Sequence, residues 1–197
     1  MTIRVVVFDL DGVVRHWDAQ LNASIEQRHG LPPDSILDTA FATDLGEAAV
    51  TGALDYDTWA ARVAERLGSP EAVAEWGAFR GHLDPDAVEL VAAVRAGGCQ
   101  VGLLSNATTR LEEDLAFLGL DGTFDVVFNT ARLGVCKPDP QVYRRVVDAV
   151  GVPADQIVFT DDTPSWAEAA TAVGLHGIPF TGVTHLRAEL QRLGVRC

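Results

Sequence analysis

Two aspartates, Asp9 and Asp11, stand one residue apart at the end of a strand-forming run, VVVFDLDGVV, at positions 5–14. Side chains at positions i and i+2 of an extended segment point the same way, so we expect both carboxylates to face one spot. Apolar residues flank the pair, and we expect no local salt-bridge partner. Two such charges repel, and one carboxyl group is forced to protonate unless a cation lies beside them. The pair is therefore either a polar turn made by Gly12 or part of a catalytic site.

Five more polar residues come just after an apolar, strand-like run or in the loop that follows one: Ser105, Asn106, Lys137, Asp161 and Asp162. Ligands of a doubly wound sheet bind beyond the carboxyl ends of its strands, so we expect these residues to meet Asp9 and Asp11 at one edge. Lys137 is the only lysine among the 15 basic residues. The chain uses arginine elsewhere, which indicates that this position needs a compact ammonium group.

This combination of side chains indicates chemistry on a phosphate group. Four carboxylates cannot face a phosphate dianion without a divalent cation between them, and ligation by oxygen alone suits Mg²⁺. Ser105, Asn106 and Lys137 would hold the phosphoryl oxygens as charge spreads in the transition state. One aspartate would attack phosphorus to form an acyl phosphate. Another would protonate the leaving oxygen and later activate water.

Five short apolar runs predict the strands that position these residues: 4–8, 99–104, 125–128, 157–160 and 175–179. Amphipathic stretches lie between the runs, with helix starts predicted at Asp84-Pro85, Asp139-Pro140, Thr163-Pro164 and Thr184. Thr109-x-x-Glu112 reads as a capping box before a further helix. Alternation of strands and helices predicts a parallel sheet with helices on both faces.

Residues 15–83 break this alternation. They show helical periodicity and no convincing strand, and they are far longer than a usual connection between strands. We interpret them as a helical lobe inserted over the carboxyl ends of the strands. Its aromatic residues Trp59, Trp76 and Phe79 fall at helical spacing, which is typical of a core. Arg15, His16 and Trp17, where the chain enters the lobe, are expected to be hinge and packing residues, with contact to a leaving group as the alternative.

Composition excludes several classes of function. A net charge of −13 and a pI of about 4.6 argue against nucleic acid and anionic membranes, because no basic stripe is present to neutralise phosphates. Asp9 interrupts the N-terminal apolar run, so we expect neither a signal peptide nor a spanning helix. Three unpatterned cysteines are typical of a reduced cytoplasmic protein, and the histidine spacing indicates no zinc site. Nothing in the sequence indicates an oligomeric state.

The segments FDLDGVV, LLSNAT, GVCKPDP and FTDDTPSW, in this order, resemble the haloacid dehalogenase superfamily of aspartate-nucleophile hydrolases. The resemblance implies a Rossmann-like three-layer α/β/α core of residues 1–14 and 84–197, with a small helical cap at 15–83. It implies Asp9 as the nucleophile and Asp11 as the general acid/base, with Ser105 and Lys137 on the phosphoryl group. It also implies Mg²⁺ as cofactor, held by Asp9, the backbone carbonyl of Asp11, Asp161 and Asp162.

One position departs from the family pattern, in which Asn or Asp commonly stands four residues after the second aspartate of the last motif. Here that residue is Trp166, and an indole donates one hydrogen bond but accepts none. This departure puts the support of the metal site in doubt. We interpret Trp166 as a packing residue at the cap interface.

The leading hypothesis is a Mg²⁺-dependent phosphatase that acts on a small soluble phosphorylated metabolite. A phosphomutase would use the same residues and return the phosphoryl group to the substrate. A 2-haloacid dehalogenase shares the nucleophile and needs no metal, but it typically lacks a second aspartate, so Asp11 argues against it. A catalytically weak binding or regulatory protein is the remaining alternative, and Trp166 alone favours it.

Overall fold

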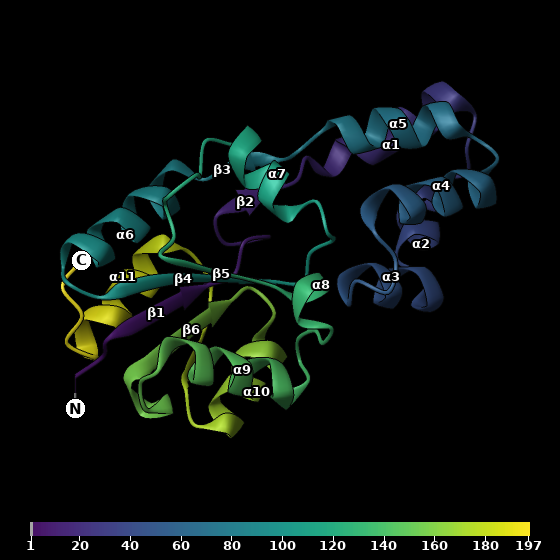
Figure 1. The fold of residues 1–197 in the computed structure, drawn as a ribbon. Helices are drawn as coiled ribbons and strands as arrows, with labels where there is room; N and C mark the ends of the chain where they lie inside the picture. The colour runs from purple at the N-terminus through teal and green to yellow at the C-terminus, as the bar shows by residue number, and fades with distance from the viewer. Residues whose placement is uncertain (1) are drawn as a thin grey trace.

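The centre of the molecule is a five-stranded parallel sheet, seen in the computed structural model, which describes residues 2–197 (Figure 1). Its strands are β1 (Val5–Phe8), β4 (Gln100–Ser105), β5 (Val126–Asn129), β6 (Ile157–Asp161) and β7 (His176–Pro179). They lie side by side in the order β5-β4-β1-β6-β7, and every neighbouring pair is parallel. The predicted strands and their parallel pairing are confirmed, with each boundary within one residue.

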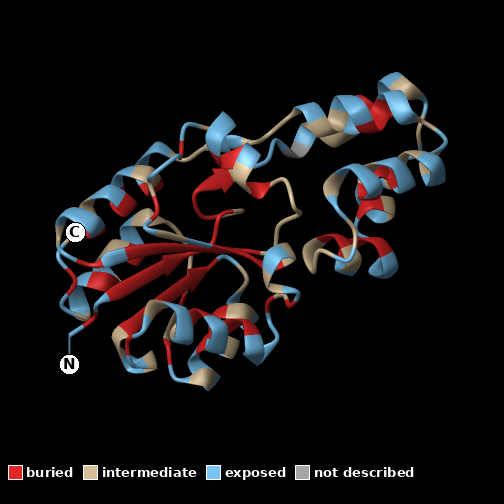
Figure 2. Cartoon of the chain, in the orientation of Figure 1, coloured by how far each residue is buried: buried red, intermediate tan, exposed pale blue. Residues whose placement is uncertain are grey.

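Helices cover both faces of this sheet. One face carries α6 (Pro85–Ala96), α7 (Leu111–Phe117) and α11 (Val183–Arg192), and the other carries α9 (Pro140–Val150) and α10 (Pro164–Val173). Strand β1 serves both layers, because Val6 and Phe8 pack toward the first set of helices while Val5 and Val7 pack toward the second. Figure 2 shows the strands buried between the helical layers. The Rossmann-like three-layer α/β/α fold is confirmed.

The short helix α8 (Thr130–Leu133) and the 3₁₀ turn η1 (Ala154–Gln156) lie in the connections of the sheet. No helix within residues 2–197 is both long enough and apolar enough to cross a membrane.

Five helices fill most of the stretch between β1 and α6: α1 (Ala19–His29), α2 (Ser35–Ala40), α3 (Thr43–Val50), α4 (Tyr56–Leu67) and α5 (Pro70–Ala78). They pack around two apolar clusters of their own, one that includes Trp59 and Val63 and one that joins Ile25 of α1 to Ile36 and Ala72. Figure 1 shows them standing to one side of the sheet. We propose that residues 15–83 are a cap on a core of residues 1–14 and 84–197, of which Met1 lies outside the described residues.

Two very short strands join the cap helices to the core. β2 (Arg15–His16) and β3 (His82–Leu83) pair in antiparallel fashion, with Arg15 opposite Leu83. The expectation of no strand within residues 15–83 is therefore wrong. A two-residue strand is too short to show an alternating pattern, so its pairing depends on tertiary contacts that the sequence does not display.

Most predicted helix starts are confirmed. The carboxylates of Asp84 and Asp139 accept hydrogen bonds from backbone N–H groups in the first turns of α6 and α9. Helix α10 begins directly after Thr163, and α11 begins at Val183, one residue before the predicted Thr184.

The predicted capping box at Thr109-x-x-Glu112 is wrong. Helix α7 begins at Leu111 and has no side-chain cap. Thr109 Oγ1 instead accepts a hydrogen bond from the backbone N–H of Tyr56 in the cap, and Glu112 pairs with Arg132. Partners that are distant in sequence have replaced the local pairing that the motif predicts.

Candidate active site

A buried ion-pair cluster lies at the carboxyl ends of two neighbouring strands. Asp9 directly follows β1 and Asp161 ends β6, and the parallel pairing of β1 with β6 brings the two carboxylates together. Lys137 Nζ lies 2.7 Å from Asp9 Oδ1 and 2.7 Å from Asp161 Oδ2, and it also donates to the Leu104 carbonyl at 3.3 Å. Asp9, Lys137 and Asp161 are 3%, 2% and 0% exposed. Charges this deeply buried are tolerable only when paired.

A third carboxylate completes a possible metal site. Asp9, Asp161 and Asp162 each offer an oxygen, and these oxygens lie within 4.8 Å of one another. Gly12 makes room for this approach, because its φ of +79° favours glycine and a Cβ there would collide with the Asp162 carboxylate. The predicted convergence of Asp9, Lys137, Asp161 and Asp162 is thus observed.

The electrostatics of these three carboxylates are unfavourable without a cation. Burial raises the pKa of Asp9 to about 7, against the opposing effect of Lys137, and Asp161 raises it further. Burial, followed by the Asp161 charge, also raises the pKa of Asp162. The one ammonium group pairs with two of these three carboxylates, Asp9 and Asp161, and leaves surplus negative charge. A donor set made only of carboxylate oxygens with surplus negative charge fits Mg²⁺.

The Asp11 side chain is held by the start of the cap. Its Oδ1 accepts hydrogen bonds from Arg15 Nε at 2.7 Å and from Trp17 Nε1 at 2.8 Å, and its Oδ2 accepts one from Arg15 Nη2 at 2.9 Å. The expectation that Asp11 lacks a local salt-bridge partner is wrong, because Arg15 four residues later is that partner. The strand ends at Phe8, so the chain has left the extended form before Asp11 and the i, i+2 rule no longer applies. The sequence-based expectation missed Arg15 as the partner of Asp11, although an arginine at i+4 was the available signal.

Arg15 links this carboxylate to the core helix α7. Its Nη1 lies 3.4 Å from Asp114 Oδ2, and Asp114 also pairs with Arg80 and with Arg110. Burial lowers the pKa of Arg15, but the hydrogen bonds and charges of Asp11 and Asp114 outweigh it and the net shift is upward. Arg15 is thus buried, as expected of a packing residue, and in addition it orients Asp11.

Ser105 and Asn106 stand at the end of β4 and line the same cavity as Asp9. Ser105 is the last residue of the strand and is 1% exposed. The Asn106 side chain forms a reciprocal pair with the backbone of Lys137: Nδ2 donates to the carbonyl at 2.9 Å, and Oδ1 accepts from the N–H at 2.8 Å. The Asn106 amide therefore positions the lysine, and its direct role on phosphoryl oxygens stays a prediction.

Side chains from several of these strand ends line one cavity of about 330 Å³, which we call the carboxylate cavity. Its lining includes Asp9, Asp11, Ser105, Asn106, Asp162 and Trp166. The Trp166 ring centroid lies 4.7 Å from Lys137 Nζ, close enough for a cation–π contact. Trp166, expected at the cap interface, thus packs over the lysine in a cavity that the hinge residues His16 and Trp17 also line.

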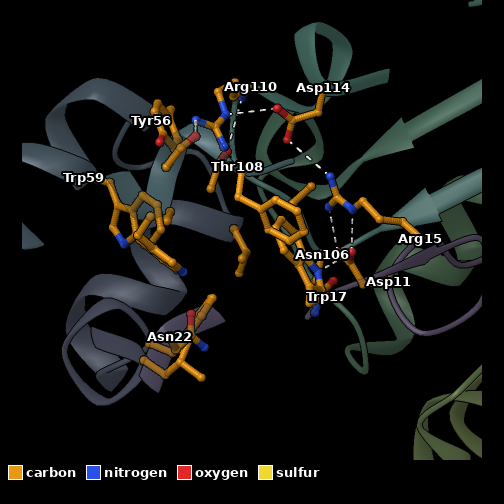
Figure 3. A pocket seen from close by; sticks show the side chains of 18 of the residues that line it. Asp11, Arg15, Trp17, Asn22, Tyr56, Trp59, Asn106, Thr108, Arg110 and Asp114 are labelled. Carbon is orange, nitrogen blue, oxygen red and sulfur yellow. Dashed lines mark hydrogen bonds and ion pairs between the residues drawn. The ribbon is translucent and has the colours of Figure 1, made fainter. Parts of the chain in front are cut away.

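A second, larger cavity of about 390 Å³ lies between the cap and the core, and Figure 3 shows its side chains. We call it the aromatic cavity, after its rings Trp17, Phe41, Tyr56, Trp59, Trp76 and Phe79. Trp59 and Trp76 also belong to the apolar cluster of the cap, as expected, whereas Phe79 packs edge-on against Trp17.

Comparisons with known proteins identify the family and the fold. A model of the haloacid dehalogenase-like hydrolase family matches residues 3–174. The chain is 30% identical to Phosphatase MT3486 of Mycobacterium tuberculosis, over 89% of this chain and 86% of that protein. It is 25% identical to the sesquiterpene phosphatase astK of Aspergillus oryzae, over 98% and 97%. A haloacid dehalogenase family enzyme of Bacteroides thetaiotaomicron, crystallised with magnesium and inorganic phosphate, shares the fold with a TM-score of 0.79 and 18% identity, over 93% of this chain and 98% of that one.

Proposed function

This chain belongs to the haloacid dehalogenase-like hydrolases and is an enzyme of the phosphatase type, and on that premise we propose that it cleaves a phosphate monoester through a phosphorylated Asp9. The observation that supports this most directly is the position of Asp9. Its carboxylate is buried against Lys137 and lines the cavity in which Ser105 and Asp162 also lie. A carboxylate held this way is an oriented nucleophile beside groups that can bind a phosphoryl group.

The proposed first step is attack of Asp9 on phosphorus. Lys137 holds Oδ1 of Asp9, so the attacking atom in this proposal is Oδ2. Lys137 and Ser105 bind the phosphoryl oxygens as charge develops on them. Asn106 keeps the lysine in place through its pair of hydrogen bonds to the Lys137 backbone. The bond from phosphorus to the ester oxygen breaks as the bond to Asp9 forms.

Asp11 carries the proton in this proposal. It donates a proton to the departing ester oxygen, and it then accepts one from the water that attacks the phosphorylated Asp9. Arg15 and Trp17 fix the direction of its carboxylate at the edge of the carboxylate cavity. The second step releases inorganic phosphate and restores Asp9.

The residues that would hold Mg²⁺ are Asp9, Asp161, Asp162 and the backbone carbonyl of Asp11. The three carboxylates fit such an ion by their spacing, their donor atoms and their surplus charge. When bound, Mg²⁺ supplies positive charge that offsets the repulsion among the carboxylates and the phosphoryl group.

Turnover of p-nitrophenyl phosphate with and without Mg²⁺ tests this function. We expect Mg²⁺-dependent release of inorganic phosphate, and we expect Asp9→Asn to lose at least about 99% of the activity because an amide cannot attack phosphorus. A phosphomutase would show itself by transfer of the phosphoryl group without net phosphate release. A dehalogenase would release halide from 2-haloacids without metal. Either result, or Asp9→Asn activity above about 1%, would contradict the proposal.

A further inference from the structure

The lining of the aromatic cavity is mainly apolar. It draws rings from three parts of the chain: Trp17 before α1, Phe41 after α2, and the others from α4, α5 and the segment after α5. Figure 3 shows Tyr56 and Trp59 on one side of the space, with Trp17 and the core residue Asn106 across from them. Aromatic side chains in a concave site offer large apolar area to a ligand.

Exposed apolar side chains concentrate at this cavity. Within residues 2–197, five large hydrophobic side chains are exposed, and three of them line it: Trp17 at 45%, Leu37 at 37% and Phe41 at 58%. The other two, Phe117 and Val127, lie outside it. Clustered apolar exposure beside a cavity is unfavourable in water and indicates a surface that an apolar ligand covers.

Four of the five charged side chains on the cavity wall are paired with one another, while the fifth, Asp18, is exposed and caps α1. Asp11 is bound by Arg15, and Asp114 is bound by Arg15 and Arg110. The Arg110 guanidinium also stacks on the Tyr56 ring, 3.7 Å from its centroid. These contacts neutralise the four paired charges and place the apolar face of the Tyr56 ring beside Arg110, so few of the charged groups on the wall remain for a ligand with many hydroxyl groups.

The aromatic cavity continues into the carboxylate cavity. Asp11, Trp17 and Asn106 line both. A phosphate ester with its phosphorus at Asp9 would pass these residues and place its alcohol portion among the rings. Asp11, the proposed donor to the ester oxygen, lies at this junction.

Resting on the phosphatase function proposed above, we infer that the alcohol portion of the substrate is a bulky hydrocarbon group that occupies the aromatic cavity. The paired charges and the ring-lined wall favour such a group over a sugar or a nucleoside, whose hydroxyl groups would lose their hydrogen bonds to water on entry. The phosphoryl group remains at Asp9, and the hydrocarbon group gives affinity and specificity.

A chain-length series tests the inference. We expect kcat/KM with Mg²⁺ to rise at least about a hundredfold from ethyl to octyl phosphate, since each methylene that enters a hydrophobic pocket contributes to discrimination. Glycerol phosphate should resemble ethyl phosphate. An active enzyme with a flat series, or with a preference for sugar phosphates, would overturn the inference and leave the phosphatase function standing.

A pair of exposed phenylalanines supplies matched variants. Phe41→Ser removes a ring of the aromatic cavity and should lower the ratio of octyl to ethyl kcat/KM at least about fivefold. Phe117→Ser removes a ring that is 71% exposed and lies elsewhere, and it should leave that ratio and the basal activity unchanged. Equal effects of the two variants would contradict the assignment.

Binding gives a readout that does not need turnover. Three of the four tryptophans, Trp17, Trp59 and Trp76, line the aromatic cavity, so octylphosphonate should change the tryptophan fluorescence at lower concentration than ethylphosphonate. Equal affinities would overturn the inference. Preferred binding of octylphosphonate without hydrolysis of any ester would overturn the phosphatase function instead and keep the cavity as an apolar site.

Discussion

Lys137 Nζ lies 2.7 Å from Oδ1 of Asp9, and the two buried side chains meet where the end of β1 faces the loop between α8 and α9. The ammonium group is enclosed by the Asp161 carboxylate and by the rings of Phe159 and Trp166, 5.5 and 4.7 Å away. This enclosure agrees with the use of lysine here by a chain that otherwise carries arginine.

Lys137→Arg should therefore fail to preserve activity although it preserves the charge. A guanidinium is larger and planar, and the enclosed space around Nζ suits a compact ammonium. We expect kcat/KM to fall at least a hundredfold, roughly 2.7 kcal/mol of transition-state stabilisation. Steady-state kinetics at saturating Mg²⁺ measure the change, with circular dichroism as the check of folding. A folded variant that loses less than about threefold would contradict the catalytic role.

We expect Trp166 to support activity through the contact of its ring with Lys137. Trp166→Leu removes the cation–π contact with Lys137, and we expect kcat/KM to fall roughly threefold to thirtyfold. Trp166→Phe keeps an aromatic face and should retain most of the activity. Comparing the two variants distinguishes the effect of an aromatic ring from the effect of side-chain volume, because leucine and phenylalanine both fill space. Equal losses would show that the contact with the lysine is unimportant.

Mg²⁺ should stabilise the folded protein by relieving repulsion among Asp9, Asp161 and Asp162. At an ion concentration a hundred times Kd the gain is about 2.7 kcal/mol, which raises Tm by roughly 5–10 °C in a domain of this size. Asp162→Asn should reduce this shift while leaving the buried Asp9–Lys137 pair intact. Thermal unfolding with and without Mg²⁺ measures the Tm shift of the wild type and of the variant, with Ca²⁺ as a comparison ion.

The effect of Mg²⁺ should also depend on pH. Because the pKa of Asp9 is raised from 3.8 to about 7, the metal-free folded state holds a proton that the unfolded state releases. The free energy of unfolding without metal should therefore fall as pH rises from about 4 through 7. Protons compete with Mg²⁺ for the same carboxylate, so the Tm shift should be larger at pH 8 than at pH 5. A larger shift at pH 5 would contradict this assignment.

Asp11→Asn should slow the chemistry and leave Mg²⁺ binding nearly unchanged. The side chain of Asp11 contacts Arg15 and Trp17, away from the group formed by Asp9, Asp161 and Asp162. Alkyl phosphates, which have poor leaving groups, should lose more rate than p-nitrophenyl phosphate, which needs little protonation. Kinetics with both substrates and a Mg²⁺ titration by calorimetry distinguish the roles. Collapse of Mg²⁺ affinity would assign the Asp11 side chain to the metal.

The sequence predicted the sheet well because its three central strands, β1, β4 and β6, are short apolar runs that are buried on both faces. The same parallel topology brought Asp9 and Asp161 together, since residues at the carboxyl ends of neighbouring parallel strands must meet. Residues whose positions follow from this rule alone can be placed from the sequence.

Contacts that cross between the cap and the core could not be predicted in this way. Thr109 contacts Tyr56 rather than capping its own helix, and Arg15 reaches both Asp11 and Asp114. The aromatic cavity could not be predicted either, because its rings come from separated parts of the chain and face one another only after the cap folds. Helical spacing indicates that such rings are buried, but it does not indicate which of them also face a cavity.

The central claim is that Asp9 forms a covalent bond to phosphorus, and mass spectrometry of acid-quenched enzyme tests it most directly. Enzyme mixed with p-nitrophenyl phosphate and Mg²⁺ should carry a phosphoryl group on the peptide that contains Asp9, and the signal should increase in Asp11→Asn because water is no longer activated for the second step. Asp9→Asn is the control and should carry none. A phosphoryl group on another residue, or multiple turnovers by Asp9→Asn at the wild-type rate, would contradict the account.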